Sequence, residues 1–199
     1  MSDTYLTIAA KSEGIYKEKM SKFMAFASPA ASAAEAKAFI AGIQKEYFDA
    51  RHVCWAYMIG SARTEFLSSD NGEPSGTAGK PILGQINSFG LTNVAIAVVR
   101  YFGGIKLGTS GLIVAYREAA KAALEAAVIE ERHDMASISF TFPYLAMNSV
   151  MRLVKNSDAA IVSQTFDNSC AMTLSIRADH APRLIEALSD IDGTSIVSL

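Results

Sequence analysis

Two glycine-rich segments carry the residues of this sequence whose types and spacing could do chemistry. The first is residues 68–82, SSDNGEPSGTAGKPI, and the second is residues 103–111, GGIKLGTSG. Each supplies glycines, hydroxyl side chains and one lysine, Lys80 or Lys106, close to the start of a predicted helix. That combination is typical of loops that bind phosphate, so a nucleotide site is the first hypothesis to test.

Neither segment is one of the two common nucleotide-binding loops. A P-loop needs G-x-x-x-x-G-K-[ST], in which successive backbone N–H groups surround the phosphates and a hydroxyl binds magnesium. Around Gly79 and Lys80, the required first glycine is Pro74 and the required hydroxyl residue is Pro81. The first segment also follows a polar stretch, residues 64–70, where a P-loop follows a hydrophobic strand. The second segment lacks the G-x-G-x-x-G spacing of dinucleotide-binding loops.

The second segment keeps the features of a general anion site. Thr109 and Ser110 lie where a helix is predicted to begin, which is the end that carries partial positive charge, and Arg100 and Lys106 could add cationic contacts. In a purely structural interpretation the glycines make a tight strand-to-helix turn and Ser110 only caps the helix. Composition alone favours the structural interpretation.

Combinations suited to nucleophilic or acid–base catalysis are weak. His52 and Cys54 are two residues apart on a predicted strand, so they would share a face and could form a thiol–imidazole pair. A buried, unreactive cysteine is the simpler expectation. Asp70 and Glu73 could act as paired carboxylates, although Asp-Asn-Gly-Glu-Pro is also a turn sequence. No catalytic residue is assigned.

The histidines and cysteines form no pattern of a metal site or a disulfide. His52, His133 and His180 are scattered, so no metal and no cofactor are expected. Cys54 and Cys170 lie far apart and are expected to be free thiols. The chain has no apolar stretch long enough to span a bilayer and no secretory signal, so a cytoplasmic protein without membrane contact is expected.

The distribution of charge indicates where an anion could bind. The formal net charge of the 199 residues is -2, which argues against nucleic-acid binding driven by bulk positive charge. Residues 51–128 have seven basic and five acidic side chains, whereas residues 136–199 have four basic and six acidic. An anion-binding surface should therefore lie in the first part of the chain.

Hydrophobic periodicity predicts an α+β protein with two domains, residues 1–131 and 136–199, separated by a charged, non-periodic stretch at 129–137. In the first domain, Ser32 and Glu35 form a capping box and Thr77 is expected to cap a helix over 78–88. The second domain is predicted to have the β-α-β-β-α-β order of a ferredoxin-like fold, with a turn at 167–169.

The glycine-rich segments belong to a longer pattern. SDNGEPSGTAGKPIL, LTNVAIAVVRYFGGIKLGTSGL and AYREA, together with SKFMAFA and ARHVCWAY, resemble the signature of the YigZ/IMPACT family over residues 21–119. The resemblance implies a first domain similar to the second domain of a small-subunit ribosomal protein. It implies a second domain similar to the last domain of elongation factor G.

Three functions remain open. The resemblance implies a regulatory or binding protein linked to translation control through contact with RNA, the ribosome or a translation factor, with no defined reaction. The alternative is an enzyme that acts on a small phosphorylated or acyl substrate at the two glycine loops. A third interpretation makes both loops structural and places a protein–protein contact elsewhere. The first is preferred, and the oligomeric state is not predicted.

The candidate binding surface is built on the family signature. The sequence departs from the usual family pattern at Ser110, which replaces a glycine, and at Val114, which replaces an arginine. Arg51 also puts a charge beside His52. Weaker attraction for a polyanion is the expected consequence. The candidate residues are Asp70, Gly72, Glu73, Pro74, Ser75, Gly76, Thr77, Lys80, Arg100, Tyr101, Phe102, Gly103, Gly104, Lys106, Gly108, Ser110 and Gly111, with His52 as an additional candidate.

Overall fold

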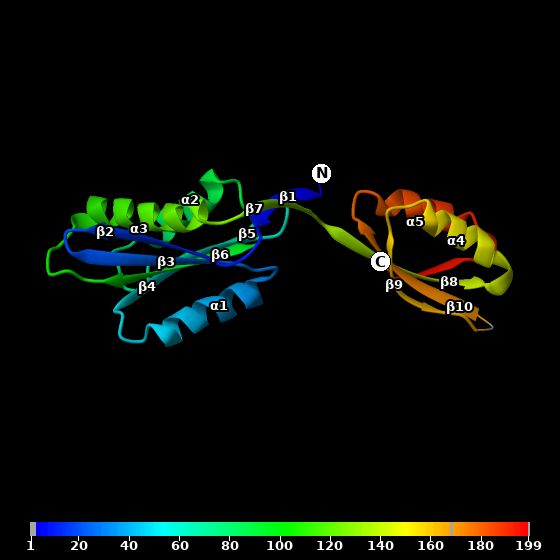
Figure 1. Ribbon diagram of the computed structural model, residues 1–199, viewed down its shortest axis with the longest axis horizontal. Helices are drawn as coiled ribbons and strands as arrows, with labels where there is room; N and C mark the ends of the chain where they lie inside the picture. Colours follow the sequence, from blue (N-terminus) through cyan, green and yellow to red (C-terminus); the bar gives the residue numbers. More distant parts are fainter. Residues whose placement is uncertain (1–2, 168, 199) are drawn as a thin grey trace. The chain divides into compact units, whose positions relative to one another are not determined.

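The computed structural model describes residues 3–167 and 169–198 (Figure 1). The chain divides into two compact units. One is Tyr5–Arg132, and the other consists of residues 3 and 4 together with the described residues from 133 onward. Each unit buries a hydrophobic core of its own. Among the described residues, no helix is both long and apolar enough to cross a membrane.

The first unit is built on a five-stranded antiparallel sheet with strand order β2-β3-β6-β4-β5. The sequence pattern identifies the residues of β5 only as part of a polar stretch. β5 is an edge strand, which pairs on one side only and leaves most of its side chains in water. Its two apolar residues, Phe66 and Leu67, are both exposed, so the strand has no buried apolar face that a periodic pattern could reveal. The strands are β2 (Ser12–Glu18), β3 (Ser21–Pro29), β4 (His52–Ile59), β5 (Glu65–Ser69) and β6 (Val94–Tyr101).

Helices cover both faces of this sheet. Helices α2 (Gly79–Ser88) and α3 (Gly108–Glu125) lie on one face, and α1 (Ala33–Glu46) lies on the other (Figure 1). The larger core lies between the sheet and the α2/α3 layer. The predicted cap of α1 is confirmed, since the backbone N–H of Glu35 donates to Ser32 Oγ at 3.2 Å.

The charged stretch after α3 is a regular strand and not an irregular linker. Strand β7 (Ile129–His133) pairs with β1 (Thr4–Ile8) in a two-stranded sheet. The partner strand β1 is far from residues 129–137 in sequence, so local composition there does not reveal the pairing. Strand β8 (Met135–Pro143) follows almost at once.

The second unit has the predicted β-α-β-β-α-β order. Its antiparallel sheet has the strand order β11-β8-β10-β9, and both of its longer helices pack on the core formed by that sheet. The predicted turn at 167–169 includes position 168, which lies outside the described residues. After β8 come the 3-10 helix η1 (Tyr144–Ala146), α4 (Met147–Lys155), β9 (Ala160–Thr165), β10 (Ser169–Arg177), α5 (Ala181–Ser189) and β11 (Ser195–Ser198).

An ion pair joins Asp3 to Arg177 within the second unit. Arg177 Nη2 donates to Asp3 Oδ1 at 2.9 Å, and Arg177 Nε donates to Asp3 Oδ2 at 3.2 Å. These hydrogen bonds from Arg177 hold the pKa of Asp3 well below its usual range. Residues 3 and 4 therefore belong to the second unit although they precede the first in sequence.

Candidate functional site

Sheet topology brings the two glycine-rich segments to one end of the sheet. Strands β5 and β6 both pair antiparallel to β4, so they run in the same direction and the loops that follow them emerge at the same end. The β2–β3 turn and the start of β4 reach this end as well, since Arg100 is opposite Phe23 on one side and His52 on the other. We call this region the loop end, and it comprises residues 19–20, 47–51, 70–80 and 102–107.

Asp70 organises the first glycine-rich segment. Its carboxylate accepts three backbone hydrogen bonds, from Gly76 N at 2.7 Å, Gly79 N at 2.8 Å and Ala78 N at 3.0 Å. Burial would raise the pKa of Asp70, but these donors together outweigh it and leave the pKa lowered. Asp70 thus supplies the negative charge that the N-terminus of α2 favours.

The prediction that Thr77 caps α2 is wrong. Its hydroxyl donates to the carbonyl oxygen of Pro74 at 2.7 Å, and the residue before the helix, Ala78, has no capping side chain. Asp70 lies eight residues before Ala78, too far along the chain for a local capping pattern to identify it. The segment is a closed loop folded around one carboxylate.

Glu73 and Arg100 join the two glycine-rich segments inside the protein. Arg100 Nη1 donates to Glu73 Oε1 at 2.6 Å, and the Tyr116 hydroxyl of α3 donates to the same oxygen at 2.8 Å. The side chains of Arg100 and Glu73 are only 9% and 4% exposed. Arg100 is therefore neutralised by a buried partner, and its charge does not face solvent.

Aromatic rings enclose the Arg100 guanidinium. Its central carbon lies 5.5 Å from the centroid of the Phe23 ring and 5.6 Å from that of Phe102, distances at which cation–π attraction operates. Phe23 also meets Tyr116 edge to face at 5.1 Å. Arg100 Nε is buried without a hydrogen-bond partner among the described residues. The cluster is packed as part of the core.

His52 and Cys54 do not form the hypothesised thiol–imidazole pair. His52 Nδ1 lies 2.8 Å from the carbonyl oxygen of Asn71, whereas the Cys54 thiol donates to the carbonyl oxygen of Asp70 at 2.9 Å. Burial raises the pKa of the Cys54 thiol to about 12. Both side chains tie β4 to the first loop, and the thiol stays protonated at neutral pH.

Two glycines show why these loops are rich in small residues. A Cβ on Gly103 would lie 2.1 Å from the carbonyl carbon of Met20, so only glycine fits against the β2–β3 turn. Gly103 N also donates to Ser21 Oγ at 3.1 Å. Gly72 has φ +83°, a left-handed conformation that favours glycine, and it lies against the His52 ring.

Other candidate residues separate between the faces and helices of the unit. Tyr101 alternates with Arg100 along β6 and lies on the α1 face, where its hydroxyl donates to Asp49 Oδ1 at 2.8 Å. Ser110 was expected to cap α3, but the helix already begins at Gly108 and has no side-chain cap. That expectation of a serine cap is therefore wrong.

The exposed part of the loop end is mainly apolar and cationic, and its exposed acidic residue, Asp49, accepts a hydrogen bond from Tyr101. Phe102 is 58% exposed, and Lys80 and Lys106 are also exposed. Five further exposed side chains lie at this end but are not among the predicted site residues. Their turns are distant in sequence, and only the sheet register brings them to this end. These side chains are Lys19, Met20, Phe48, Arg51 and Ile105. Among the remaining candidates, Gly72, Pro74, Ser75, Gly104, Gly108 and Ser110 are exposed, while Gly76 and Gly111 are half-buried.

A small cavity of about 290 Å³ lies beside the start of α3. The two positions that depart from the family pattern, Ser110 and Val114, both line it. The other lining residues are Glu18, Lys19, Leu107 and Gly111. Within residues 3–167 and 169–198, no three His, Cys, Asp or Glu side chains gather as metal ligands would.

Comparison with known proteins identifies the family. The Impact N-terminal domain model matches residues 19–124. The chain belongs to the IMPACT family. An IMPACT family member of Haemophilus influenzae is 34% identical over 187 residues, which cover 92% of this chain and 88% of that protein. The IMPACT family member YigZ of Escherichia coli is 29% identical over 196 residues, covering 98% and 96%.

The likeness to known proteins extends over both units. A crystal structure of a hypothetical protein matches with a TM-score of 0.76 and 27% identity, covering 100% of this chain and 98% of that one. All candidate residues of the loop end lie inside the range that the IMPACT domain model matches. The second unit lies outside that range, but the relatives of similar length include it.

Proposed function

We propose that this IMPACT family member is a non-catalytic binding protein that contacts RNA of the translation apparatus through the loop end. One observation carries the proposal. The groups considered for acid–base or thiol chemistry form hydrogen bonds within the protein, whereas an aromatic ring and several cationic side chains of the loop end face solvent. Such a surface is suited to binding a ligand and not to transforming one.

The chemistry of the exposed side chains supports RNA as the ligand. Phe102 offers a ring on which an unpaired base can stack, and Lys80 and Lys106 can contact phosphates. Arg51 and Lys19 add positive charge at the same end of the sheet. The acidic groups of the loop end are engaged: Asp70 with the start of α2, Glu73 with Arg100 and Asp49 with the Tyr101 hydroxyl. The surface therefore attracts a polyanion although the whole chain is slightly acidic.

The proposal includes what the family resemblance implies. It takes the IMPACT-type domain, residues 1–131, as the RNA-binding part and similar to the second domain of a small-subunit ribosomal protein. It takes residues 136–199 as similar to the last domain of elongation factor G. It places the protein in the cytoplasm as a regulator of translation.

The enzyme alternative has less support. It requires His52, Asp70 or Glu73 to reach a substrate, and each is held by a bond to the protein itself. None of the three lines the 290 Å³ cavity beside α3. The lowered pKa of Asp70 has a structural cause, since backbone N–H groups at the start of α2 stabilise its charge.

Co-sedimentation of the full chain with purified ribosomes tests the proposal. We expect binding that weakens steeply between about 50 and 200 mM salt, because RNA contact releases counterions. The double variant Lys80→Ala/Lys106→Ala should reduce the slope of log affinity against log salt by about two. Phe102→Ala should weaken binding with little change in that slope, because stacking releases no counterion. Lys37→Ala, an exposed lysine of α1, is the matched control.

Two results would overturn the proposal. One is the absence of binding at low salt. The other is binding that resists nuclease treatment and is unchanged in the loop-end variants, which would assign the contact to a protein and to another surface.

A further inference from the structure

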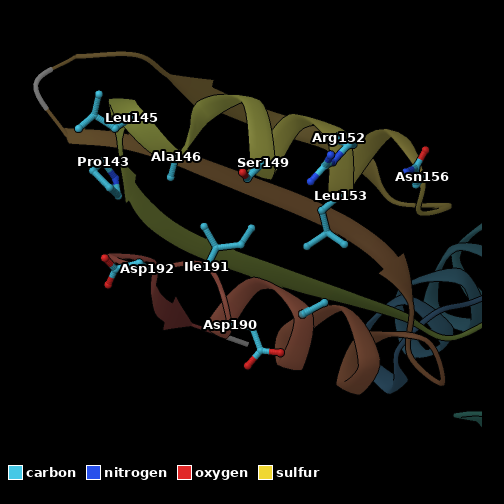
Figure 2. Close-up of a pocket in the computed structure, with 11 residues that line it drawn as sticks. Pro143, Leu145, Ala146, Ser149, Arg152, Leu153, Asn156, Asp190, Ile191 and Asp192 are labelled. Atoms are coloured by element: carbon cyan, nitrogen blue, oxygen red, sulfur yellow. The ribbon is translucent and has the colours of Figure 1, made fainter.

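A groove runs between α4 and α5 in the second unit. Its first part is a cavity of about 660 Å³, and Figure 2 shows Leu153 and Ile191 pointing into the space between the two helices. A second cavity of about 450 Å³ continues toward the start of α5. Both cavities share Leu153, Asn156 and Ala187, so they adjoin, and we call the two together the groove.

The floor of the groove is apolar. Leu153 and Ala187 lie at its middle, Ala146 and Ile191 lie toward one end, and Leu184 lies toward the other. These side chains are only partly covered by the core, apart from Leu184, which is buried. A ligand that enters the groove therefore gains by covering apolar surface.

The rim of the groove is acidic. Aspartates 158, 179, 190 and 192 line it, against the arginines 152 and 183, which leaves a formal charge of -2 when His180 is neutral. Asp158 and Asp179 are partly engaged, the first by His180 at 2.7 Å and the second by Arg177 at 3.1 Å. Asp190 and Asp192 have no side-chain partner within the described part of the chain, so their charges are available to a ligand.

We propose that this groove binds a cationic amphipathic peptide segment of a partner protein. Its apolar side chains would cover Leu153, Ala187 and Ile191, and its lysines or arginines would pair with Asp190 and Asp192. The acidic rim opposes RNA, and within the described residues no phenylalanine, tyrosine or tryptophan lines either cavity to stack on a base, while the His180 ring is bound to Asp158. The peptide site is chemically the opposite of the cationic loop end, and it stands independently of the RNA proposal.

The probe is a labelled synthetic peptide of lysine and leucine in which leucines recur every three or four residues. It is titrated into the ¹⁵N-labelled full chain at low salt. We expect amide shifts confined to α4, α5 and the loop at residues 190–192. A peptide with glutamate in place of lysine, and a peptide with serine in place of leucine, should leave these amides unmoved. A short single-stranded RNA should shift the loop end and not the groove.

Substitutions separate a specific site from general charge attraction. Asp190→Asn/Asp192→Asn should weaken peptide binding about three- to tenfold, because two exposed ion pairs are lost. Glu186→Gln is the matched control, since Glu186 lies on α5 but lines neither cavity. Ala187→Phe should fill the groove and abolish binding, while Ala160→Phe on exposed β9 should not.

Several outcomes would overturn the proposal. They are equal binding of the acidic peptide, RNA shifts in the groove, an unchanged affinity in the double aspartate variant, or an affinity in Glu186→Gln that falls equally. Circular dichroism of each variant establishes that it is folded. Because the RNA proposal is tested at the loop end, either proposal can fail without the other.

Discussion

Nη1 of Arg100 lies 2.6 Å from Oε1 of Glu73, and the two side chains are 9% and 4% exposed. Arg100 is the penultimate residue of the central strand β6 and Glu73 lies in the loop before α2, so this contact closes the first glycine-rich segment over the sheet. A buried pair of this kind need not add net stability, but removal of one partner leaves an uncompensated charge in the core.

Glu73→Ala should therefore lower the free energy of unfolding by about 3 to 5 kcal/mol. Urea unfolding followed by tryptophan fluorescence measures it, because the only tryptophan of the chain, Trp55, lies in β4 of the same unit. Tyr116→Phe removes a single hydrogen bond to the same carboxylate and should cost about 1 kcal/mol. If the free energy of unfolding of Glu73→Ala is within about 1 kcal/mol of the wild-type value, the ion pair does not hold this loop closed.

Asp70→Ala should destabilise the first unit by about 2 to 4 kcal/mol, because three backbone N–H groups lose the carboxylate that accepts their hydrogen bonds. Asp70→Asn keeps one side-chain oxygen and should cost less. The lowered pKa of Asp70 also predicts a pH dependence. The stability that the ionised Asp70 side chain contributes is complete above the pKa of about 3.9 that it has in the unfolded chain. It is lost as the pH falls through the lower pKa of the folded protein.

Unfolding free energies measured between pH 7 and pH 3 test this dependence. The wild type should lose stability toward pH 3 more steeply than Asp70→Asn does. Parallel curves for the two proteins would show that Asp70 is not held as a carboxylate by the start of α2.

Gly103→Ala should destabilise the first unit strongly, because a Cβ there would lie 2.1 Å from the carbonyl carbon of Met20. Gly84 provides the matched control. It is exposed within α2, and a Cβ on it meets nothing within 4 Å. Gly84→Ala should therefore stabilise by about 0.5 to 1 kcal/mol, the usual gain for alanine in a helix. Thermal unfolding distinguishes the two variants, because the unfolding temperature should fall in Gly103→Ala and rise in Gly84→Ala. A rise in both variants would contradict the close approach at Gly103.

Cys54 should be unreactive in the folded protein. Its thiol is fully buried and bonded to the Asp70 carbonyl, and burial raises its pKa to about 12. Cys170 is buried as well. A chromogenic disulfide reagent should thus label almost no thiol in native buffer at pH 8 and both thiols in denaturant. Rapid labelling of one thiol in the native state would contradict this placement, and peptide mapping would show which cysteine reacted.

The sequence by itself determined the features that depend on residues near one another in the chain. The cap of α1 at Ser32 follows from a local capping pattern, and the helix predicted over 78–88 and observed over 79–88 follows, like the β-α-β-β-α-β order of the second unit, from periodicity, which acts over three or four residues. The family signature is likewise a linear pattern, and the domain match confirms the family.

Tertiary structure decided which of the signature residues face a ligand. Asp70 caps α2 in place of Thr77 because the folded loop brings its carboxylate within 3.0 Å of three backbone donors. Arg100 is sequestered by Glu73, 27 residues before it, since a buried charge needs a partner and the fold supplies one. The linear pattern groups the signature residues as one polar surface. Burial divides them into an internal hydrogen-bonded network and an exposed end that is mainly apolar and cationic.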